Sequence, residues 1–293
     1  MIRYDVVRGW AFDDVRYEYD DRDVMLYALA VGLGQDPTDP ATLRFVHEKN
    51  LQVLPTFACI AGAPGAWWRD PRTGADAVRL LQGEQHLEVY RPIPPTGALL
   101  ARNRVHSLTD KGPGKGAIGV VLRDLLDPAS GELIARSTNV SVLRGDGGFS
   151  AADGRSDPPP PPLPAIPDVP PTATVSLESR AESALLYRLT GDRNPLHSDP
   201  DVARAAGFRE PILHGLCTFA MACHAALRSL LDYDVARFAR LAVRFTAPVY
   251  PGERLEFHFW NGFAPGEWRL RAVVPERGVT VLDNGVLQTR GSG

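Results

Sequence analysis

The chain has 293 residues, 44% of them hydrophobic, with a formal net charge of −3 and an isoelectric point of about 6.2. This size and hydrophobic content are typical of a globular protein with one large or two ordinary domains. The slight acidic balance argues against non-specific nucleic-acid binding, which relies on a basic surface. No apolar run approaches the roughly 18 residues of a transmembrane helix, so we expect no membrane span.

Targeting signals and disulfides are not expected either. The opening MIRYDVVRGW lacks the charged-then-apolar layout of a secretory signal, and the ending TRGSG is not a peroxisomal address. We therefore expect a soluble cytoplasmic protein of bacterial type. The three cysteines, Cys59, Cys217 and Cys223, are odd in number and do not form a disulfide framework, so we expect buried free thiols.

The N-terminal part of the chain predicts a helix followed by strands. Residues 21–34 are apolar on most sides and end in glycines, which indicates a buried helix that stops at Gly32 or Gly34. Four β-rich segments follow, separated by Pro/Gly turns, as in an antiparallel meander: 86–93, 98–108, 117–127 and 132–144.

A proline-rich segment, residues 145–174, divides the chain. It contains five consecutive prolines at 158–162, so it cannot form a helix or a central strand. Polyproline II geometry makes it a semi-rigid connector able to cross a domain face. We expect an N-terminal domain at 1–144, a linker at 145–174 and a C-terminal domain at 175–293.

The C-terminal part repeats the helix-then-strands order. Residues 211–232 predict a helix that is apolar nearly all round, and such a helix must be enclosed. Strands are predicted at 241–250, 254–263, 267–275 and 279–288. A curled antiparallel sheet around one central helix satisfies both halves, so the predicted fold class is α+β with this arrangement occurring twice.

The segment TGDRNPLH, residues 190–197, gathers polar side chains on a turn before a short capped helix at 198–207. One interpretation is purely local: Asp192 bridges backbone amides, Asn194 makes an Asx turn and His197 is a satisfied polar residue. The other is chemical, because a carboxylate and an imidazole together orient water and move its protons near neutral pH.

Residues 187–220, which contain this loop, closely resemble the signature of the MaoC-like hydratases, specifically the type 2 enoyl-CoA hydratases, including the hydratase unit of the peroxisomal multifunctional β-oxidation enzyme. Segments 27–57, 83–94 and 109–116 resemble the N-terminal domain of that family. The resemblance implies a double hotdog fold. It also implies that the first hotdog accommodates the acyl group and the second carries catalysis, and the lack of a second GDxNPxH motif in residues 1–144 is consistent with this.

The same resemblance implies a reaction and site residues. The reaction is reversible addition of water to a trans-2-enoyl-CoA, giving the (3R)-3-hydroxyacyl-CoA. Asp192 and His197 would position and activate the water, with Asn194 arranging the site. The backbone N–H of Gly215 would stabilise the thioester oxyanion, which suits a glycine near a helix N-terminus.

Substrate-binding residues are expected to be Arg193, His214, Arg244 and Glu48, the last because it matches a family glutamate in FVHEKN. Guanidinium groups suit the CoA phosphates, and sequence does not choose among Arg193, Arg204, Arg209, Arg240 and Arg244. We expect no metal, although histidines and cysteines gather near residues 214–224, and no cofactor, since CoA is part of the substrate.

Other functions remain open at this point. The same site could dehydrate 3-hydroxyacyl thioesters in synthetic or steroid side-chain pathways, and the hotdog fold also hosts acyl-CoA thioesterases. A non-catalytic acyl-CoA binding role is a third alternative. We expect a homodimer. Acyl-chain length, direction in the cell and oligomeric state do not follow from the sequence.

Overall fold

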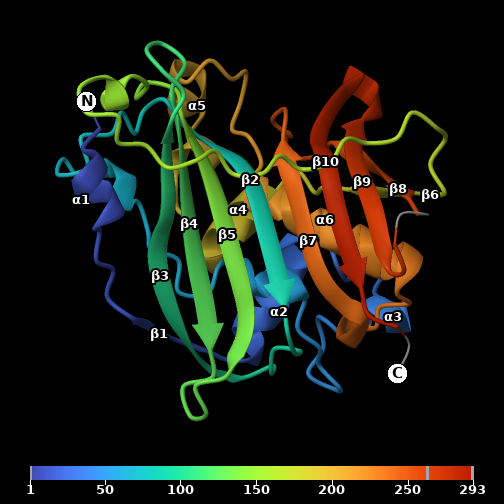
Figure 1. The fold of residues 1–293 in the computed structure, drawn as a ribbon. Helices are drawn as coiled ribbons and strands as arrows, with labels where there is room; N and C mark the ends of the chain where they lie inside the picture. Colours follow the sequence, from blue (N-terminus) through green and yellow to red (C-terminus); the bar gives the residue numbers. More distant parts are fainter. Residues whose placement is uncertain (1, 262–263, 292–293) are drawn as a thin grey trace.

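The computed structural model describes residues 2–261 and 264–291 and contains one continuous ten-stranded antiparallel sheet (Figure 1). The strand order is β1-β3-β4-β5-β2-β7-β10-β9-β8-β6. The first half of the chain supplies β1 Val15–Tyr19, β2 Leu80–Val89, β3 Gly97–Asp110, β4 Ala117–Leu126 and β5 Leu133–Leu143. The second half supplies β6 Ala173–Glu178, β7 Phe238–Phe245, β8 Arg254–Trp260, β9 Glu267–Val274 and β10 Val279–Thr289.

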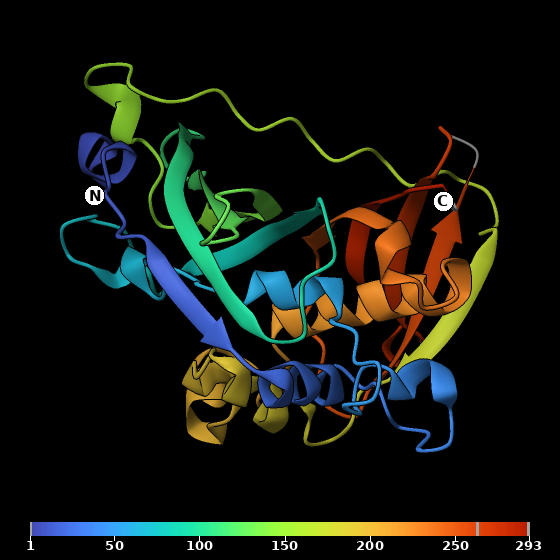
Figure 2. The same ribbon diagram turned by 90° about the horizontal axis from the view of Figure 1, so that it is seen from below.

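The helices lie mainly on the inner, concave face of the sheet (Figure 2). The α-helices are α1 Tyr4–Arg8, α2 Asp21–Ala30, α3 Pro40–Leu43, α4 Ser183–Tyr187, α5 Pro200–Ala205 and α6 Gly215–Leu230. The 3₁₀ turns are η1 Pro55–Cys59, η2 Trp67–Arg69, η3 Phe149–Ala151, η4 Arg188–Thr190, η5 Pro195–His197, η6 Val235–Arg237 and η7 Pro275–Arg277. No helix in the described part of the chain is both long and apolar enough to cross a bilayer.

The two halves of the sheet join at a seam between β2 and β7. These strands pair antiparallel from Glu84↔Arg244 to Glu88↔Arg240, so the five strands of each half continue into those of the other. Each half is a hotdog-type curled sheet, and together they form the predicted double hotdog. All eight predicted strands are present, with boundaries shifted by a few residues; the last two residues of the predicted strand 254–263 lie outside the described residues.

The second half encloses its helix as predicted. Every residue of α6 from Cys217 to Leu227 is buried, and the helix runs across the concave face of the sheet (Figure 2). Burial of a helix on all sides explains why its sequence is apolar nearly all round. Cys59, Cys217 and Cys223 are buried and free, as expected.

The first half differs from the expected plan because its predicted central helix is not enclosed by the sheet. Helix α2 forms but ends at Ala30, before Gly32 with its φ of 96°, and exposes Arg22 and Asp23. It packs against α4, while the segment that contacts β2, β5 and α6 is the short turn η1, with all five residues buried. The short η1 leaves more room under the first half of the sheet than a full helix would.

From residue 154 to 167 the proline-rich segment has no helix or turn, as predicted, and it crosses the outer face of the sheet (Figure 2). The Asp157 carboxylate anchors its start by accepting from the Leu108 N–H at 2.7 Å and pairing with Arg8. Leu163 packs on Ala242 and Val286. The last two residues of segment 145–174 already belong to β6; the domain limits 1–144 and 175–293 stay a prediction.

Candidate active site

The GDRNPLH loop follows η4 and ends in η5, and its polar side chains first of all hold the turn together. The Asp192 carboxylate accepts from the Asn194 N–H at 3.1 Å, and the Asn194 side-chain oxygen accepts from the Leu196 N–H at 3.2 Å. Asp199 then caps α5. The local interpretation of these turn contacts is therefore correct, and the Asp192 side chain is also exposed.

His197 is buried at the base of this loop, and its ring orientation is fixed. Its Nδ1 donates to the carbonyl oxygen of Ile212 at 2.8 Å, so in the neutral ring Nε2 carries the free lone pair. Burial lowers the pKa of His197 below its usual 6.5, and the nearby Asp192 carboxylate only partly offsets this. The imidazole is thus neutral at pH 7 and able to accept a proton.

His214 lies directly against His197. The two rings stack with centroids 3.8 Å apart, and His214 Nε2 donates to the backbone oxygen of Asp192 at 3.1 Å. Burial, followed by repulsion from His197, lowers the pKa of His214 to about 4, so this ring is also neutral. The hydrogen bond from His214 to the backbone oxygen of Asp192 holds this part of the loop in position.

Asp192, His197 and His214 bring ligand-type atoms within 4.8 Å of one another. A metal needs lone pairs that converge on one point, and the lone pairs of an imidazole lie in its ring plane. The two rings are within 28° of parallel and stacked, so their lone pairs run side by side. This arrangement is poor for a metal ion and suits proton transfer better.

Gly215 is the first residue of α6 and follows the N-cap residue His214. No group in the described part of the chain accepts from its N–H, as expected for the first turn of a helix. The N-terminus of this 16-residue helix also carries partial positive charge. Phe245 of β7 and Gln82 of β2 flank Gly215 at 3.4 and 3.6 Å from its Cβ position.

Two of the predicted substrate-binding residues, Glu48 and Arg244, contact charged neighbours outside the loop. Glu48 is 73% exposed and lies beside His47 on the surface, and its contact with the site stays a prediction. Arg244 pairs with Glu84 at 3.0 Å. Because neighbours on a strand point to opposite faces and Phe245 points to Gly215, Arg244 lies on the outer face, and its role in substrate binding stays a prediction.

The remaining candidates for binding CoA phosphates can now be compared. Arg204 pairs with Asp201, and Arg209 pairs with Glu210 while stacking on Tyr250. Arg240 lies under the linker. Arg193 is exposed on the loop itself and has no ion-pair partner among the described residues, so it is the best placed of the predicted cations.

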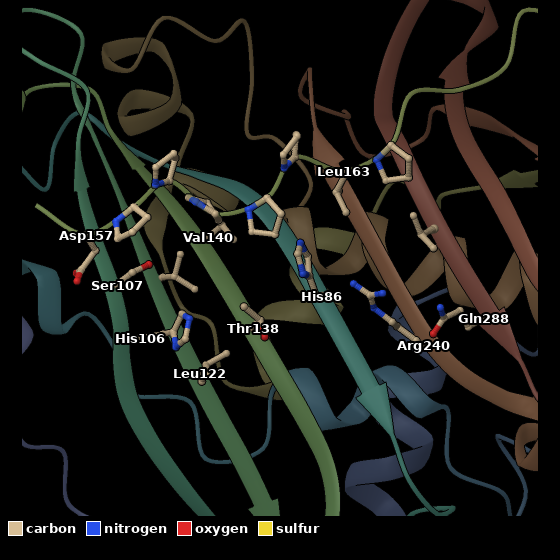
Figure 3. Close-up of a pocket in the computed structure, with 18 of the residues that line it drawn as sticks. His86, His106, Ser107, Leu122, Thr138, Val140, Asp157, Leu163, Arg240 and Gln288 are labelled. Atoms are coloured by element: carbon tan, nitrogen blue, oxygen red, sulfur yellow. The ribbon is translucent and has the colours of Figure 1, made fainter.

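The described part of the structure has one cavity beside the loop and a larger one on the opposite face. One of about 200 Å³ lies between the first half and the catalytic loop, and it is lined by Tyr17, Asp23, Leu26, Phe57, Ile60, Leu189, Thr190 and Gly191. It adjoins Asp192 through Gly191. A larger one of about 600 Å³ lies on the opposite face, between the linker prolines and outward-facing side chains such as His86, Thr138 and Arg240 (Figure 3). It is separate from the loop.

One residue at the site, Gln82, was not expected from the sequence. It belongs to the first half of the chain yet lies beside Gly215 of the second half. The available signal was the glycine in QGEQ, residues 82–85, because a glycine inside a strand often marks a bulge.

The fold is that of a double hotdog, with the GDRNPLH loop in its second half. A family model of the MaoC like domain matches residues 163–274, and one of the MFE-2 hydratase 2 N-terminal domain matches residues 17–145. The 3-hydroxyacyl-thioester dehydratase Y of Mycobacterium tuberculosis is 39% identical over 96% of both chains. The peroxisomal enoyl-CoA hydratase 2 of Arabidopsis thaliana is 37% identical over 87% of this chain and 86% of that protein.

Solved structures agree with these matches. A MaoC-like dehydratase from Phytophthora capsici superposes with a TM-score of 0.85, at 29% identity over 99% of both chains. Full-length peroxisomal multifunctional enzyme type 2 from Drosophila melanogaster gives a TM-score of 0.79 at 32% identity, covering 94% of this chain and 48% of that one. The chain belongs to the MaoC-like family of hydratases and dehydratases.

Proposed function

We propose that this protein is an (R)-specific 2-enoyl-CoA hydratase that adds water reversibly to trans-2-enoyl-CoA thioesters. The observation that carries the proposal is the placement of a neutral, oriented His197 and the Asp192 carboxylate beside the free N–H of Gly215. Acid–base groups and an oxyanion donor are the two parts this reaction requires. Membership of the hydratase and dehydratase family supports it.

In the proposed mechanism, Asp192 and His197 hold a water molecule over C3 of the substrate. The water oxygen bonds to C3 as its proton passes to the site, and a proton is delivered to C2 on the same face. Negative charge that develops on the thioester oxygen is stabilised by the Gly215 N–H and the positive end of α6. Atoms balance without a resident cofactor, since CoA is part of the substrate.

The cavity beside Gly191 suits the acyl chain, because it joins the first half to the catalytic loop. Its volume of about 200 Å³ is below the roughly 300–1,000 Å³ of pockets for drug-sized ligands, so short acyl chains should fit better than a steroid side chain with its rings. Arg193 is the proposed contact for a CoA phosphate. A homodimer stays a prediction.

The same site would run in reverse as a 3-hydroxyacyl-thioester dehydratase, and the 39% identity to a protein of that name favours this second candidate. The first experiment is to mix the protein with four-carbon and ten-carbon trans-2-enoyl-CoA, follow loss of the conjugated double bond and determine product stereochemistry. Formation of (3R)-hydroxyacyl-CoA without free CoA supports the proposal. Release of free thiol without hydration would support a thioesterase instead.

The equilibrium position alone does not separate hydratase from dehydratase, so both directions need rates. Initial rates for enoyl-CoA hydration and for (3R)-hydroxyacyl-CoA dehydration, with the (3S) isomer as the control substrate, test direction and stereospecificity together. Equal turnover of the two isomers would contradict the R-specific assignment.

A further inference from the structure

A β-bulge in β2 brings a residue of the first half into the site. The strand pairs with β5 in register Gln82↔Ser141 and then Glu84↔Val140, so Gly83 is an extra residue. A Cβ on Gly83 would lie 2.7 Å from Val142, which explains the glycine. Because the extra residue shifts the alternation of side chains, Gln82 and Gln85 both face the inner side.

A chain of hydrogen bonds fixes the Gln82 side chain. Its Nε2 donates to Gln85 Oε1 at 3.1 Å, and Gln85 Nε2 donates to Ser137 Oγ and to the His86 carbonyl oxygen, both at 2.9 Å. A backbone carbonyl only accepts, so Gln85 must present its amino group there and its oxygen to Gln82. Gln82 must then use its own amino group in this chain.

The chain ends in a buried cation. Arg123 is 6% exposed, and its guanidinium donates to the Cys59 carbonyl oxygen at 2.5 Å and to Ser137 Oγ at 3.4 Å. It ties β4 to η1 and holds Ser137 in place for Gln85. The side chain of Gln82 is therefore supported from the core of the first half, as a preorganised contact requires.

This support leaves Gln82 Oε1 free as an acceptor, 3.6 Å from the Cβ position of Gly215. A CoA thioester has an amide N–H two methylene groups from its sulfur, and the enoyl chain itself has no donor. We propose that Gln82 accepts a hydrogen bond from this pantetheine amide and so positions the thioester carbonyl at Gly215. The inference rests on the proposed function, with the first half supplying a positioning residue.

The test uses two small substrates that differ in one group. Crotonyl N-acetylcysteamine thioester carries the amide N–H, and its analogue with an ester oxygen in place of that N–H does not. Wild type should prefer the amide by about 3- to 10-fold in kcat/KM, as for one ordinary hydrogen bond, with the difference mainly in KM. Gln82→Met, which is similar in length but accepts poorly, should hydrate both at equal kcat/KM.

Gln288→Met, on the outer face of β10, is the matched control and should keep the wild-type preference. If Gln82→Met is unstable by circular dichroism, Gln82→Ala replaces it. A preference that survives in the folded Gln82 variant overturns the inference, as does a wild type that shows no preference. If wild type hydrates neither thioester nor any enoyl-CoA, the proposed function itself fails, which is a distinguishable result.

Discussion

The imidazole rings of His197 and His214 stack with centroids 3.8 Å apart and planes at 28°. Protonation of either ring would put a buried cation against the other, and burial already lowers the pKa of both below 6.5. Both rings are therefore neutral at pH 7, which keeps the Nε2 of His197 available as an acceptor.

The first prediction concerns the pH dependence of turnover. Because neutral His197 is required and burial lowers its pKa below 6.5, kcat for hydration should fall in acid with a midpoint below pH 6.5. Initial rates with a short enoyl-CoA in constant-ionic-strength buffers measure this pH dependence. Loss of activity centred at or above pH 7 would contradict the neutral, buried assignment.

Acid should also destabilise the fold. The unfolded chain takes up protons on His214 and His224 near pH 6.5, whereas burial lowers both folded pKa values to about 4. The stability contributed by these two neutral histidines is therefore fully present above pH 6.5. The free energy of unfolding declines by up to a few kcal/mol as the pH falls toward 4. Urea unfolding at pH 7 and pH 5 tests this.

His224→Gln supplies the matched variant for that measurement. His224 contacts Tyr233, away from the catalytic loop, so the substitution should keep hydratase activity while removing part of the pH-dependent loss of stability. An unchanged difference between pH 7 and pH 5 would show that other groups dominate.

Asp192→Asn should leave the fold intact and lower kcat by about 10²- to 10⁴-fold, the usual contribution of general acid–base catalysis. Asparagine keeps the side-chain oxygen that accepts from the Asn194 N–H, so the turn is retained. Asp201→Asn, on the exposed helix α5, is the control. Near-wild-type turnover in a folded Asp192→Asn protein would contradict the catalytic role of Asp192.

Gly215 allows a direct test of a backbone donor. Proline is favoured at the first position of a helix, and His214 before it has φ −58° and ψ 134°, which a following proline permits. Gly215→Pro should fold and lower kcat about 10²- to 10³-fold by deleting the N–H. Gly215→Ala keeps the N–H and places Cβ at 3.4 Å from Phe245, so its kcat should fall much less. Equal loss in both variants would assign the effect to steric crowding.

Arg193→Ala should raise KM for enoyl-CoA by about 10-fold, in line with a charge-assisted hydrogen bond to phosphate, without changing KM for the N-acetylcysteamine thioester, which has no phosphate. Arg244→Gln should change neither, because Arg244 faces the outer side with Glu84. A KM effect from Arg244 rather than Arg193 would reverse this assignment.

The sequence predicted the features that depend on local pattern. The apolar residues of α6, the capped helix after Asp199 and the turn roles of Asp192 and Asn194 are all local, and all are present. The double hotdog and the catalytic loop followed from motif resemblance. The edge strands β1 and β6 were missed, since each is short and pairs along one side only.

Residue roles that depend on sheet geometry were harder to predict from the sequence. Glu48 and Arg244 matched expected roles by motif and charge, but burial and the side a strand residue faces decide what they touch. Gln82 was missed for the same reason. The extra residue Gly83 turns the Gln82 side chain to the inner face, and only the pairing register of β2 with β5 shows this. His214 was expected near substrate, and only the structure shows that it bonds to the backbone oxygen of Asp192 and stacks on His197.

The pairing of β2 with β7 explains an advantage of having both halves in one chain. Either half alone would end in a row of unpaired backbone donors and acceptors, which is a template for association with other chains. The linker keeps the complementary edge at a high effective concentration, so closure within one molecule competes well against pairing between molecules. Covalent fusion of the halves thus serves as protection against aggregation as well as a means of assembling the site.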